Sequence, residues 1–477
     1  MLAYNISHEF CDGDALPAES TSITSLVRDR FYKVCPGSHR SADDGNYATL
    51  GQPRCGDGTN YSFMVSRPPE NPQQQREKIL IELMGGGACW DAVTCAIQKD
   101  MLTFPTWLSA VIGKGCSDSA FSDYLLCSKT VGGVDFSEYT TVMIPYCTQD
   151  VHLGDEQNVD YGVKHVGAHN LQRTLQWVFE NFPDPSHIFI TGCSAGGTPL
   201  PVVYDMINSH YKSALDRSDY EELHIDVIVD SAVFLTPSHF LENYLPNWNL
   251  DTIMNSIGFD YDSHKMLESY PDSVMDYALK RSKKTDQYGF ASHDDDQISQ
   301  YYYTLMNGEP LFGRDRLLYT PESGKLGAVN VKRRTSNNDE QSQWWSQMNS
   351  SMKGAMNEHK NSHPFVMEGS GHCFGSLSIA LQYAGFEEWA SSNVLENGVD
   401  IPVSDLPGPP NSGSVTFANS SVTQSTSNTD LLRPPLNISV PSTDPSDGIT
   451  NVAAHHTSSS FIVAAMFMLS FRLQLLK

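Results

Sequence analysis

Residues 188–197 read Ile188-Phe189-Ile190-Thr191-Gly192-Cys193-Ser194-Ala195-Gly196-Gly197. A short run of β-branched and aromatic residues, typical of a strand, stops at a glycine, and an apolar segment with prolines suited to a first helical turn follows. A strand, a tight turn and a helix with the pattern Gly-x-Ser-x-Gly are typical of a nucleophile elbow, which exposes a serine hydroxyl. An ordinary glycine–serine turn also fits the five residues alone, but the flanking strand and helix favour the elbow.

Segments on both sides of this stretch predict an alternation of strands and helices. The apolar positions between Val163 and Phe182 recur every three or four residues, which indicates an amphipathic helix. Further strands are expected at residues 61–65, 79–84, 139–144, 223–230, 287–292 and 363–368. Because most of their apolar runs are continuous, we expect an α/β fold with a mostly parallel sheet and helices on both faces. The broken helical pattern of residues 235–284 predicts a cap over the edge of the sheet.

Changes in composition along the 477 residues divide the chain into four parts. Residues 1–52 are rich in Asp, Ser and Gly and are predicted to be irregular. Residues 53–403 carry the strand and helix patterns and form the predicted α/β domain. Residues 404–460 are dominated by Ser, Thr, Pro and Asn, which predicts a disordered stalk. Residues 461–477 are hydrophobic and form a predicted C-terminal anchor signal.

Charge and cysteine usage narrow the class of protein. The formal net charge of -25 argues against nucleic acid and against an anionic membrane surface as partners. Two pairs among the ten cysteines, Cys89 with Cys95 and Cys116 with Cys127, lie close in sequence and suit disulfides in an oxidising compartment. We expect Cys89 and Cys95 to be joined. A zinc site is not expected, because neither a second pair of cysteines nor a histidine pair lies at ligand spacing.

The sequence carries mixed signals on localisation. Residues 1–10 lack the basic start and apolar run of a signal peptide. The apolar run 461–471 is followed by Arg472 and is shorter than the roughly 20 residues that span a membrane. It suits a GPI signal behind the small residues 446–448, with a tail anchor as the alternative. Asn-x-Ser sequons, compatible with secretion, begin at Asn5, Asn60, Asn349, Asn419 and Asn437. We therefore expect an extracellular or cell-surface protein that can attach to a membrane through its C-terminus.

Three chemically active groups follow predicted strands in the order serine, acid, histidine. Ser194 ends the first of these strands, the acidic run Asp294-Asp295-Asp296 follows the strand at 287–292, and His372 follows the last strand. This is the chain order of an α/β-hydrolase triad. A serine hydroxyl is a poor nucleophile, so a neutral imidazole must take its proton and a carboxylate must hold that imidazole in the right tautomer. Alone, the histidine would more often be structural and the acidic run a solvated surface; the combined order favours catalysis.

A glycine-rich loop supplies the donors that acyl transfer requires. Gly85-Gly86-Gly87-Ala88 stands at the end of the strand at 79–84, where its amides can approach a substrate closely. The amides of Gly87 and Ala88, with the amide of Ala195, are predicted to form the oxyanion hole. A phosphate-binding loop is excluded, because no Lys-Ser or Lys-Thr follows the glycines.

Four motifs in this order resemble the pectin acetylesterase/Notum family. They are residues 85–95 (GGGACWDAVTC), residues 144–154 (IPYCTQDVHLG), residues 192–197 (GCSAGG) and the pair His372-Cys373. The resemblance runs from about Tyr61 to Ala384. It implies a serine esterase of α/β-hydrolase type that needs no cofactor or metal, with Ser194 as nucleophile and His372 as base.

The resemblance leaves the acid and the pocket open. The family has an Asp followed shortly by Gln, which here offers three choices ahead of Gln297. We expect Asp294, three residues before that Gln, to be the acid, with Asp295 as second choice. Ala88 stands where plant members have Trp, and this difference affects the shape of the pocket rather than the backbone donor.

These observations predict hydrolysis of a carboxylic ester. We expect the substrate to carry O-acetyl groups on a pectin-like or other extracellular polysaccharide. One alternative is a Notum-like deacylase that acts on a fatty-acylated protein, and another is a non-catalytic surface binding protein on a hydrolase fold. The intact serine, histidine and glycine loop argue against the latter. Polar residues in the cap favour an open groove and a short acyl group: Asn243, Asn247, Asn249, Asp251, Asp260, Asp262 and Glu268.

Overall fold

The computed structural model describes residues 16–17, 22–28, 30–36, 52–68, 76–105, 130–131, 134–157, 159–232, 235–250, 254, 272–294, 296–306, 318–319, 326–327, 359–367, 371–374 and 385–395. The chain divides into two units, residues 1–409 and 410–477, and every described residue lies in the first. The predicted stalk and hydrophobic tail therefore lie outside the described residues, as do Cys116 and Cys127.

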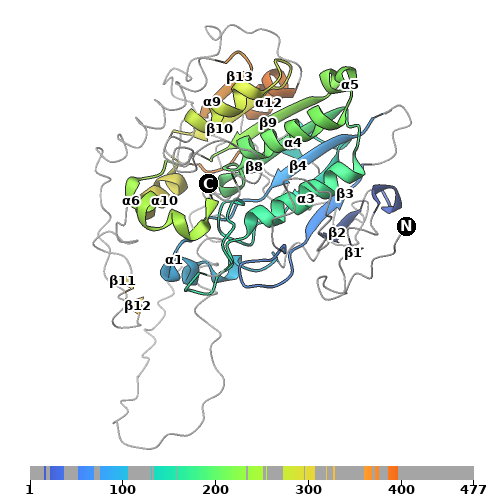
Figure 1. Ribbon diagram of the computed structural model, residues 1–477. Helices are drawn as coiled ribbons and strands as arrows, with labels where there is room; N and C mark the ends of the chain where they lie inside the picture. The colour runs from blue at the N-terminus through green and yellow to red at the C-terminus, as the bar shows by residue number, and fades with distance from the viewer. Residues whose placement is uncertain are drawn as a thin grey trace, which may run out of the picture. The chain divides into compact units, whose positions relative to one another are not determined.

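A nine-stranded sheet forms the centre of the first unit (Figure 1). The order of its strands is β1-β2-β3-β7-β4-β8-β9-β10-β13. Pairing is antiparallel between β2 and β3 and between β3 and β7, and parallel between all other neighbours. The strands are β1 (Leu16–Pro17), β2 (Phe31–Cys35), β3 (Phe63–Ser66), β4 (Lys78–Leu83), β7 (Thr140–Ile144), β8 (His187–Cys193), β9 (His224–Asp230), β10 (Tyr288–His293) and β13 (Ser362–Met367). The α/β class predicted from the sequence is confirmed.

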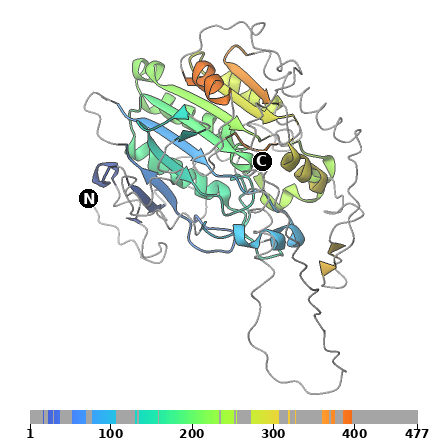
Figure 2. The same ribbon diagram turned by 180° about the vertical axis from the view of Figure 1, so that it is seen from behind.

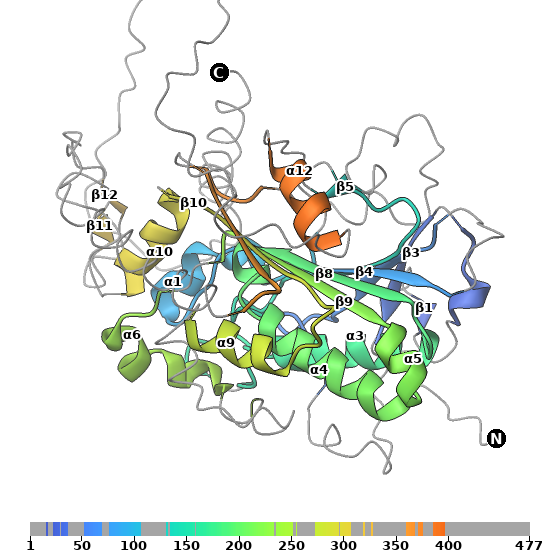
Figure 3. The same cartoon turned by 90° about the horizontal axis from the view of Figure 1, so that it is seen from above.

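Helices cover both faces of this sheet, as Figure 3 shows. One face carries α3 (Gly167–Asn181), α4 (Leu200–Ala214), α5 (Arg217–Glu222) and α9 (Asp272–Arg281), and the other carries α12 (Phe386–Ala390). Every residue of β8 and β9 except the first of each strand is buried, which explains why their apolar runs are continuous. The predicted amphipathic helix corresponds to α3, which lies under the strands.

The carboxyl ends of five parallel strands meet at one edge of the sheet. The register pairs Leu83 with Gly192, Cys193 with Asp230, and His293 with Met367. Three helices gather near this edge: α1 (Ala92–Ile97), α6 (Ser238–Asn243) and α10 (Gln297–Met306). Loops that follow β4, β8, β9, β10 and β13 are thereby brought together, which is where open α/β sheets place their binding crevice.

Two expectations need correction. Residues 1–52 were expected to be irregular, yet β1 and β2 lie within them and extend the sheet at one edge (Figure 2). The segment 235–284, predicted as a cap, does not act as one throughout. Its helix α9 packs against α4, on the face of the sheet that also carries α3 and α5. Among the described residues, none of the helices has the length and apolar character that crossing a membrane demands.

Candidate active site

Ser194 stands at the sharp turn between β8 and α4. Its backbone has φ 57°, in the left-handed region that non-glycine residues rarely adopt. The flanking glycines make this turn possible, because a Cβ on Gly192 would meet the backbone of Gly196, and a Cβ on Gly196 would meet the backbone of Leu83 in β4. The Ser194 hydroxyl makes no hydrogen bond to a described residue. The elbow geometry is therefore present, with a strained serine at its apex.

The carboxylate that contacts His372 belongs to Asp296. The Nδ1–H of His372 donates to both carboxylate oxygens of Asp296, at 2.9 and 2.8 Å. The same carboxylate accepts the amides of Ile298 and Ser299, each at 3.0 Å, and the Ser299 hydroxyl at 2.9 Å. Asp296 is fully buried and directly precedes α10, so the helix terminus and the histidine together satisfy its charge.

The sequence-based choice of Asp294 is not the residue that the structure brings to His372. The backbone amide of Asp294 donates to the Met367 carbonyl at 3.0 Å, so Asp294 still continues the pairing of β10 with β13. The chain turns only after this residue, and the carboxylate two positions later reaches the imidazole. The distance of each Asp from Gln297 in the sequence does not show where the chain turns. Asp295, the second choice, lies outside the described residues.

The protonation of His372 is set by burial and two carboxylates. Burial lowers the pKa of His372, but the neighbouring carboxylates of Asp296 and Asp230 outweigh it, and the pKa is raised above its usual value. The buried Nε2 atom of His372 has no hydrogen-bond partner among the described residues. Nε2 is therefore available to accept a proton, while Asp296, which is hydrogen-bonded to Nδ1, fixes the tautomer of the ring.

A disulfide and a polar pair hold the loop that carries His372. Cys193 and Cys373 are joined, so the residue before Ser194 is bonded to the residue after His372. On the other side of the loop, the amide of Cys373 donates to the Ser231 hydroxyl at 2.9 Å, and the amide of Phe374 donates to the Asp230 carboxylate at 2.7 Å. Asp230 ends β9, Ser231 follows it directly, and both are buried. The loop that carries His372 is thus fixed to the ends of β8 and β9.

The glycine loop follows β4 and lies against the elbow. A Cβ on Gly85 would meet the Cys193 carbonyl, and Gly87 has φ 80°, a value that glycine adopts without strain. Of the predicted oxyanion donors, Gly87, Ala88 and Ala195 all line one cavity. The Ala88 amide, however, faces the hydroxyl of Tyr302 from α10 and lowers its pKa.

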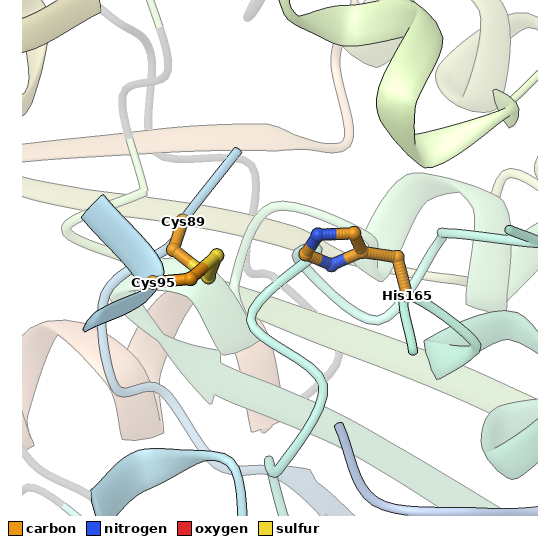
Figure 4. A group of neighbouring side chains, drawn as sticks. All are labelled: Cys89, Cys95 and His165. Carbon is orange, nitrogen blue, oxygen red and sulfur yellow. A yellow bond between two sulfur atoms is a disulfide. The ribbon is translucent and has the colours of Figure 1, made fainter. Parts of the chain in front are cut away.

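Cys89 and Cys95 form the predicted disulfide, which closes the loop between the glycines and α1 (Figure 4). The ring of His165 lies beside it, so the three residues have the composition of a metal site. Both sulfur atoms are in the disulfide, and both ring nitrogens of His165 are hydrogen-bonded, Nδ1 to the Thr148 carbonyl at 2.9 Å and Nε2 to the Tyr161 hydroxyl at 3.0 Å. Burial lowers the pKa of His165 to about 4. This group is a neutral structural contact.

The motif at residues 144–154 forms a strained loop that supports the glycine loop. Gln149, Val151 and His152 all have positive φ, and the Gln149 carbonyl accepts the Cys89 amide at 2.9 Å. His152 Nε2 bonds the Met84 carbonyl at 2.8 Å, and burial lowers the pKa of this histidine to about 4. The loop is itself anchored by a disulfide between Cys55 and Cys147. The residues of this motif therefore hold the glycine loop in position.

Ser194 and His372 line the same cavity, whose volume is ≈ 30 Å³. Its remaining walls come from the glycine loop, from Val151, from the segment after β9 and from α10. The cavity residues are Gly87, Ala88, Val151, Ser194, Ala195, Thr198, Ser231, Ala232, Ile298, Ser299, Tyr302, Met306 and His372. No hydrogen bond joins Ser194 to His372 among these described residues, as is common in sites without substrate.

Sequence reasoning missed several of these residues, although one of them carried a signal. Each partner of the Cys193–Cys373 disulfide directly adjoins a predicted triad residue, so convergence of the triad also brings these cysteines together. Asp230 ends a predicted strand, and its register partner in β8 is Cys193. The sequence therefore placed Asp230 near the site but did not indicate its contact with the loop that carries His372. Nothing in the pattern of α10 singled out Tyr302.

Comparisons with known proteins agree with this geometry. Residues 46–265, which include the glycine loop and the elbow, match the family model described as Pectinacetylesterase. Over 230 residues the chain is 26% identical to the palmitoleoyl-protein carboxylesterase NOTUM of Schmidtea mediterranea, covering 45% of this chain and 41% of that protein. It is 23% identical over 190 residues to the palmitoleoyl-protein carboxylesterase notum2 of Xenopus laevis, covering 39% of this chain and 35% of that protein.

The chain spans less than half the length of these two relatives. Asp296 and His372 lie beyond the range matched by the family model, so their assignment rests on the contacts described above. The matched range includes both the strained serine and the glycine loop. The chain is therefore similar to the pectinacetylesterase family over residues 46–265 and distantly similar to the Notum carboxylesterases.

Proposed function

We propose that this protein is a serine carboxylic ester hydrolase that removes acetyl groups from an extracellular polysaccharide. The observation that carries the proposal is the cavity in which the Ser194 hydroxyl and His372 lie together, with a buried carboxylate hydrogen-bonded to the far side of the imidazole. The match to the family model and the similarity to the NOTUM carboxylesterase support ester hydrolysis. The size of the cavity supports a short acyl group.

In the proposed reaction the Ser194 hydroxyl attacks the ester carbonyl while Nε2 of His372 takes its proton. Asp296 keeps the proton of the imidazole on Nδ1 and stabilises the positive charge that forms. The imidazolium then gives its proton to the leaving alcohol, which departs and leaves an acetyl-enzyme. Water, deprotonated by the same nitrogen, attacks the acetyl carbonyl and restores the serine. The nucleophile, the base and the carboxylate of these steps all come from the chain, and water is the second substrate.

The dimensions of the cavity favour acetyl over longer acyl groups. A cavity needs roughly 10–15 Å³ of this kind of volume to hold one water molecule. The ≈ 30 Å³ beside Ser194 therefore fits a methyl-sized group. The wall against the acyl group is apolar, with Val151, Ile298 and Met306.

The polysaccharide part of the proposal rests on the family description rather than on the cap. Three asparagines that favoured a polar groove are bonded internally. Asn247 donates to the Trp90 carbonyl at 2.8 Å, Asn249 donates to the Asp155 carbonyl at 3.2 Å, and Asn243 donates to the His239 carbonyl at 2.8 Å. Asp251, Asp260, Asp262 and Glu268 lie outside the described residues.

A second candidate is removal of a fatty acyl group from a protein. The names of the two relatives, both palmitoleoyl-protein carboxylesterases, favour it. The small cavity argues against it. Acyl chain length separates the two candidates directly.

The test is a series of p-nitrophenyl esters from acetyl to octanoyl, with acetylated pectin as polymer substrate and Ser194→Ala as control. We expect kcat/KM to be highest for acetyl and roughly 10–200-fold lower once the chain exceeds the pocket. Ser194→Ala should lose about 10⁴-fold or more of this turnover. Faster cleavage of octanoyl than of acetyl esters would replace the first candidate by the second. Equal turnover by wild type and Ser194→Ala would end both.

A further inference from the structure

The first turns of α10 form one wall of the cavity. Ile298, Ser299, Tyr302 and Met306 all line it, and their spacing of one, four and eight residues places them on one face of the helix. The helix begins directly after Asp296, whose carboxylate accepts its first amides. The Asp296 carboxylate therefore holds both the start of this helix and the imidazole of His372.

Tyr302 carries the one phenolic hydroxyl among the described residues that line this cavity. Nε2 of Gln98 donates to this hydroxyl at 3.1 Å and to the Ala88 carbonyl at 2.7 Å. A carbonyl can only accept, so the Ala88 oxygen fixes which atom of the Gln98 amide is the nitrogen. The tyrosine oxygen is accordingly an acceptor in its contact with Gln98.

The hydroxyl of Tyr302 also lies against the glycine loop. The Ala88 amide faces it and lowers its pKa, and a Cβ on Gly87 would clash with its oxygen. The amide of Gly87 itself has no hydrogen-bond acceptor among the described residues. Glycine is therefore required at position 87 both for φ 80° and for the close approach of the tyrosine.

These contacts change which groups can donate a hydrogen bond to the substrate oxygen. The Ala88 amide, expected to face the substrate oxygen, faces the tyrosine oxygen instead. That oxygen accepts a hydrogen bond from Gln98, and the tyrosine proton has no acceptor among the described residues. Two donors that converge on an oxygen polarise its O–H bond and strengthen it as a donor.

We propose that the Tyr302 hydroxyl is a catalytic donor of the oxyanion hole and takes the place of the Ala88 amide there. This inference rests on the proposed ester hydrolysis. As the carbonyl carbon becomes tetrahedral, its oxygen gains negative charge, and the tyrosine O–H donates a hydrogen bond to it together with the backbone amides of Gly87 and Ala195. No proton is transferred, so the hydroxyl is unchanged after turnover.

The hydroxyl is suited to remain a neutral donor at every pH at which the histidine works. Burial raises the pKa of Tyr302 well above its ordinary value, which outweighs the lowering effects of the Ala88 amide and of Gln98. Tyr302 therefore keeps its proton when His372 is neutral and ready to act as base.

The alternative is that Tyr302 only blocks the oxyanion hole and must move away before substrate binds. The two roles predict opposite effects of removing the hydroxyl. Loss of a donor lowers kcat, whereas loss of a block leaves kcat unchanged or raises it and lowers KM.

The experiment compares Tyr302→Phe with Tyr301→Phe on acetyl esters. Tyr301 is the neighbouring residue on the same helix and is 39% exposed, which makes it a matched control. We expect Tyr302→Phe to lower kcat by about 10²–10³-fold with KM nearly unchanged, as removal of one oxyanion donor does elsewhere. Tyr301→Phe should retain wild-type values. A boronic acid, which forms a tetrahedral adduct on serine, should bind Tyr302→Phe more weakly by a similar factor.

The outcomes distinguish the inference from the proposed function. Wild-type turnover that depends on Ser194, together with full activity of Tyr302→Phe, overturns the donor role and leaves ester hydrolysis standing. An increase in kcat/KM for Tyr302→Phe overturns it in favour of the block. Equal loss of boronic acid binding in both tyrosine variants indicates a general disturbance of α10 and also overturns it. Turnover that is independent of Ser194 removes the proposed function itself.

Discussion

Asp296 has two roles at the end of β10. Its carboxylate caps α10 through Ile298 and Ser299 and binds Nδ1 of His372, so a single buried charge orients a helix and an imidazole together. These contacts hold the carboxylate in one orientation against the imidazole. Asp294, two residues earlier, bonds through its backbone to β13 instead.

The variants Asp296→Asn and Asp294→Asn test this assignment at the residue scale. Asparagine at 296 can still accept the amides of α10, so the fold should survive, but it presents the histidine with the wrong tautomer. We expect kcat to fall about 10⁴-fold for Asp296→Asn and to change little for Asp294→Asn. Removal of the Asp296 charge also lowers the pKa of His372, so the acidic limb of the residual kcat/KM profile should move to lower pH. The reverse ranking of the two variants would assign the acid to Asp294.

At the scale of the element, the elbow depends on contact between backbones. Gly196 approaches β4 so closely that a Cβ would meet the carbonyl oxygen and carbon of Leu83. Backbone atoms of a central strand cannot shift cheaply, because they are held by pairing on both sides. The position of Ser194 relative to the glycine loop therefore follows from the packing of two adjacent strand ends.

The substitution Gly196→Ala should consequently destabilise the whole domain. We expect a loss of about 3 kcal/mol in the free energy of unfolding, the upper part of the usual range for overpacking. Gly162→Ala is the control, since Gly162 has φ 77° but open space around its Cβ position. Strain alone should cost that variant about 1 kcal/mol. Urea unfolding followed by circular dichroism measures both values, and equal losses would contradict the packing argument.

At the scale of the whole molecule, the sequence predicted the elements that are buried on both faces. Strands β4, β7, β8 and β9 and helix α3 were predicted within a few residues because burial imposes long apolar runs or a clear helical period. Strands β1 and β2 were missed because they lie at the edge of the sheet, in a segment whose polar composition hides a short run such as Phe31–Cys35.

The residues of the candidate site likewise fall into those predicted from the sequence and those found only in the structure. Ser194, His372 and the glycines were predicted because their chemistry requires particular residue types in a particular chain order. The acid, the Cys193–Cys373 disulfide and Tyr302 depend on turns and helix faces that bring distant residues into contact. Local patterns do not encode such contacts, so these parts of the site came only from the three-dimensional structure.

The most direct test of the account is to trap the acetyl-enzyme. Wild-type protein is mixed with p-nitrophenyl acetate, quenched with acid within the first turnovers, digested and analysed by mass spectrometry, with Ser194→Ala as control. We expect a burst of p-nitrophenol matched by acetylation of the peptide that contains Ser194, and neither in the control. Turnover of the ester without acetyl on that peptide, or a burst that persists in Ser194→Ala, would contradict it.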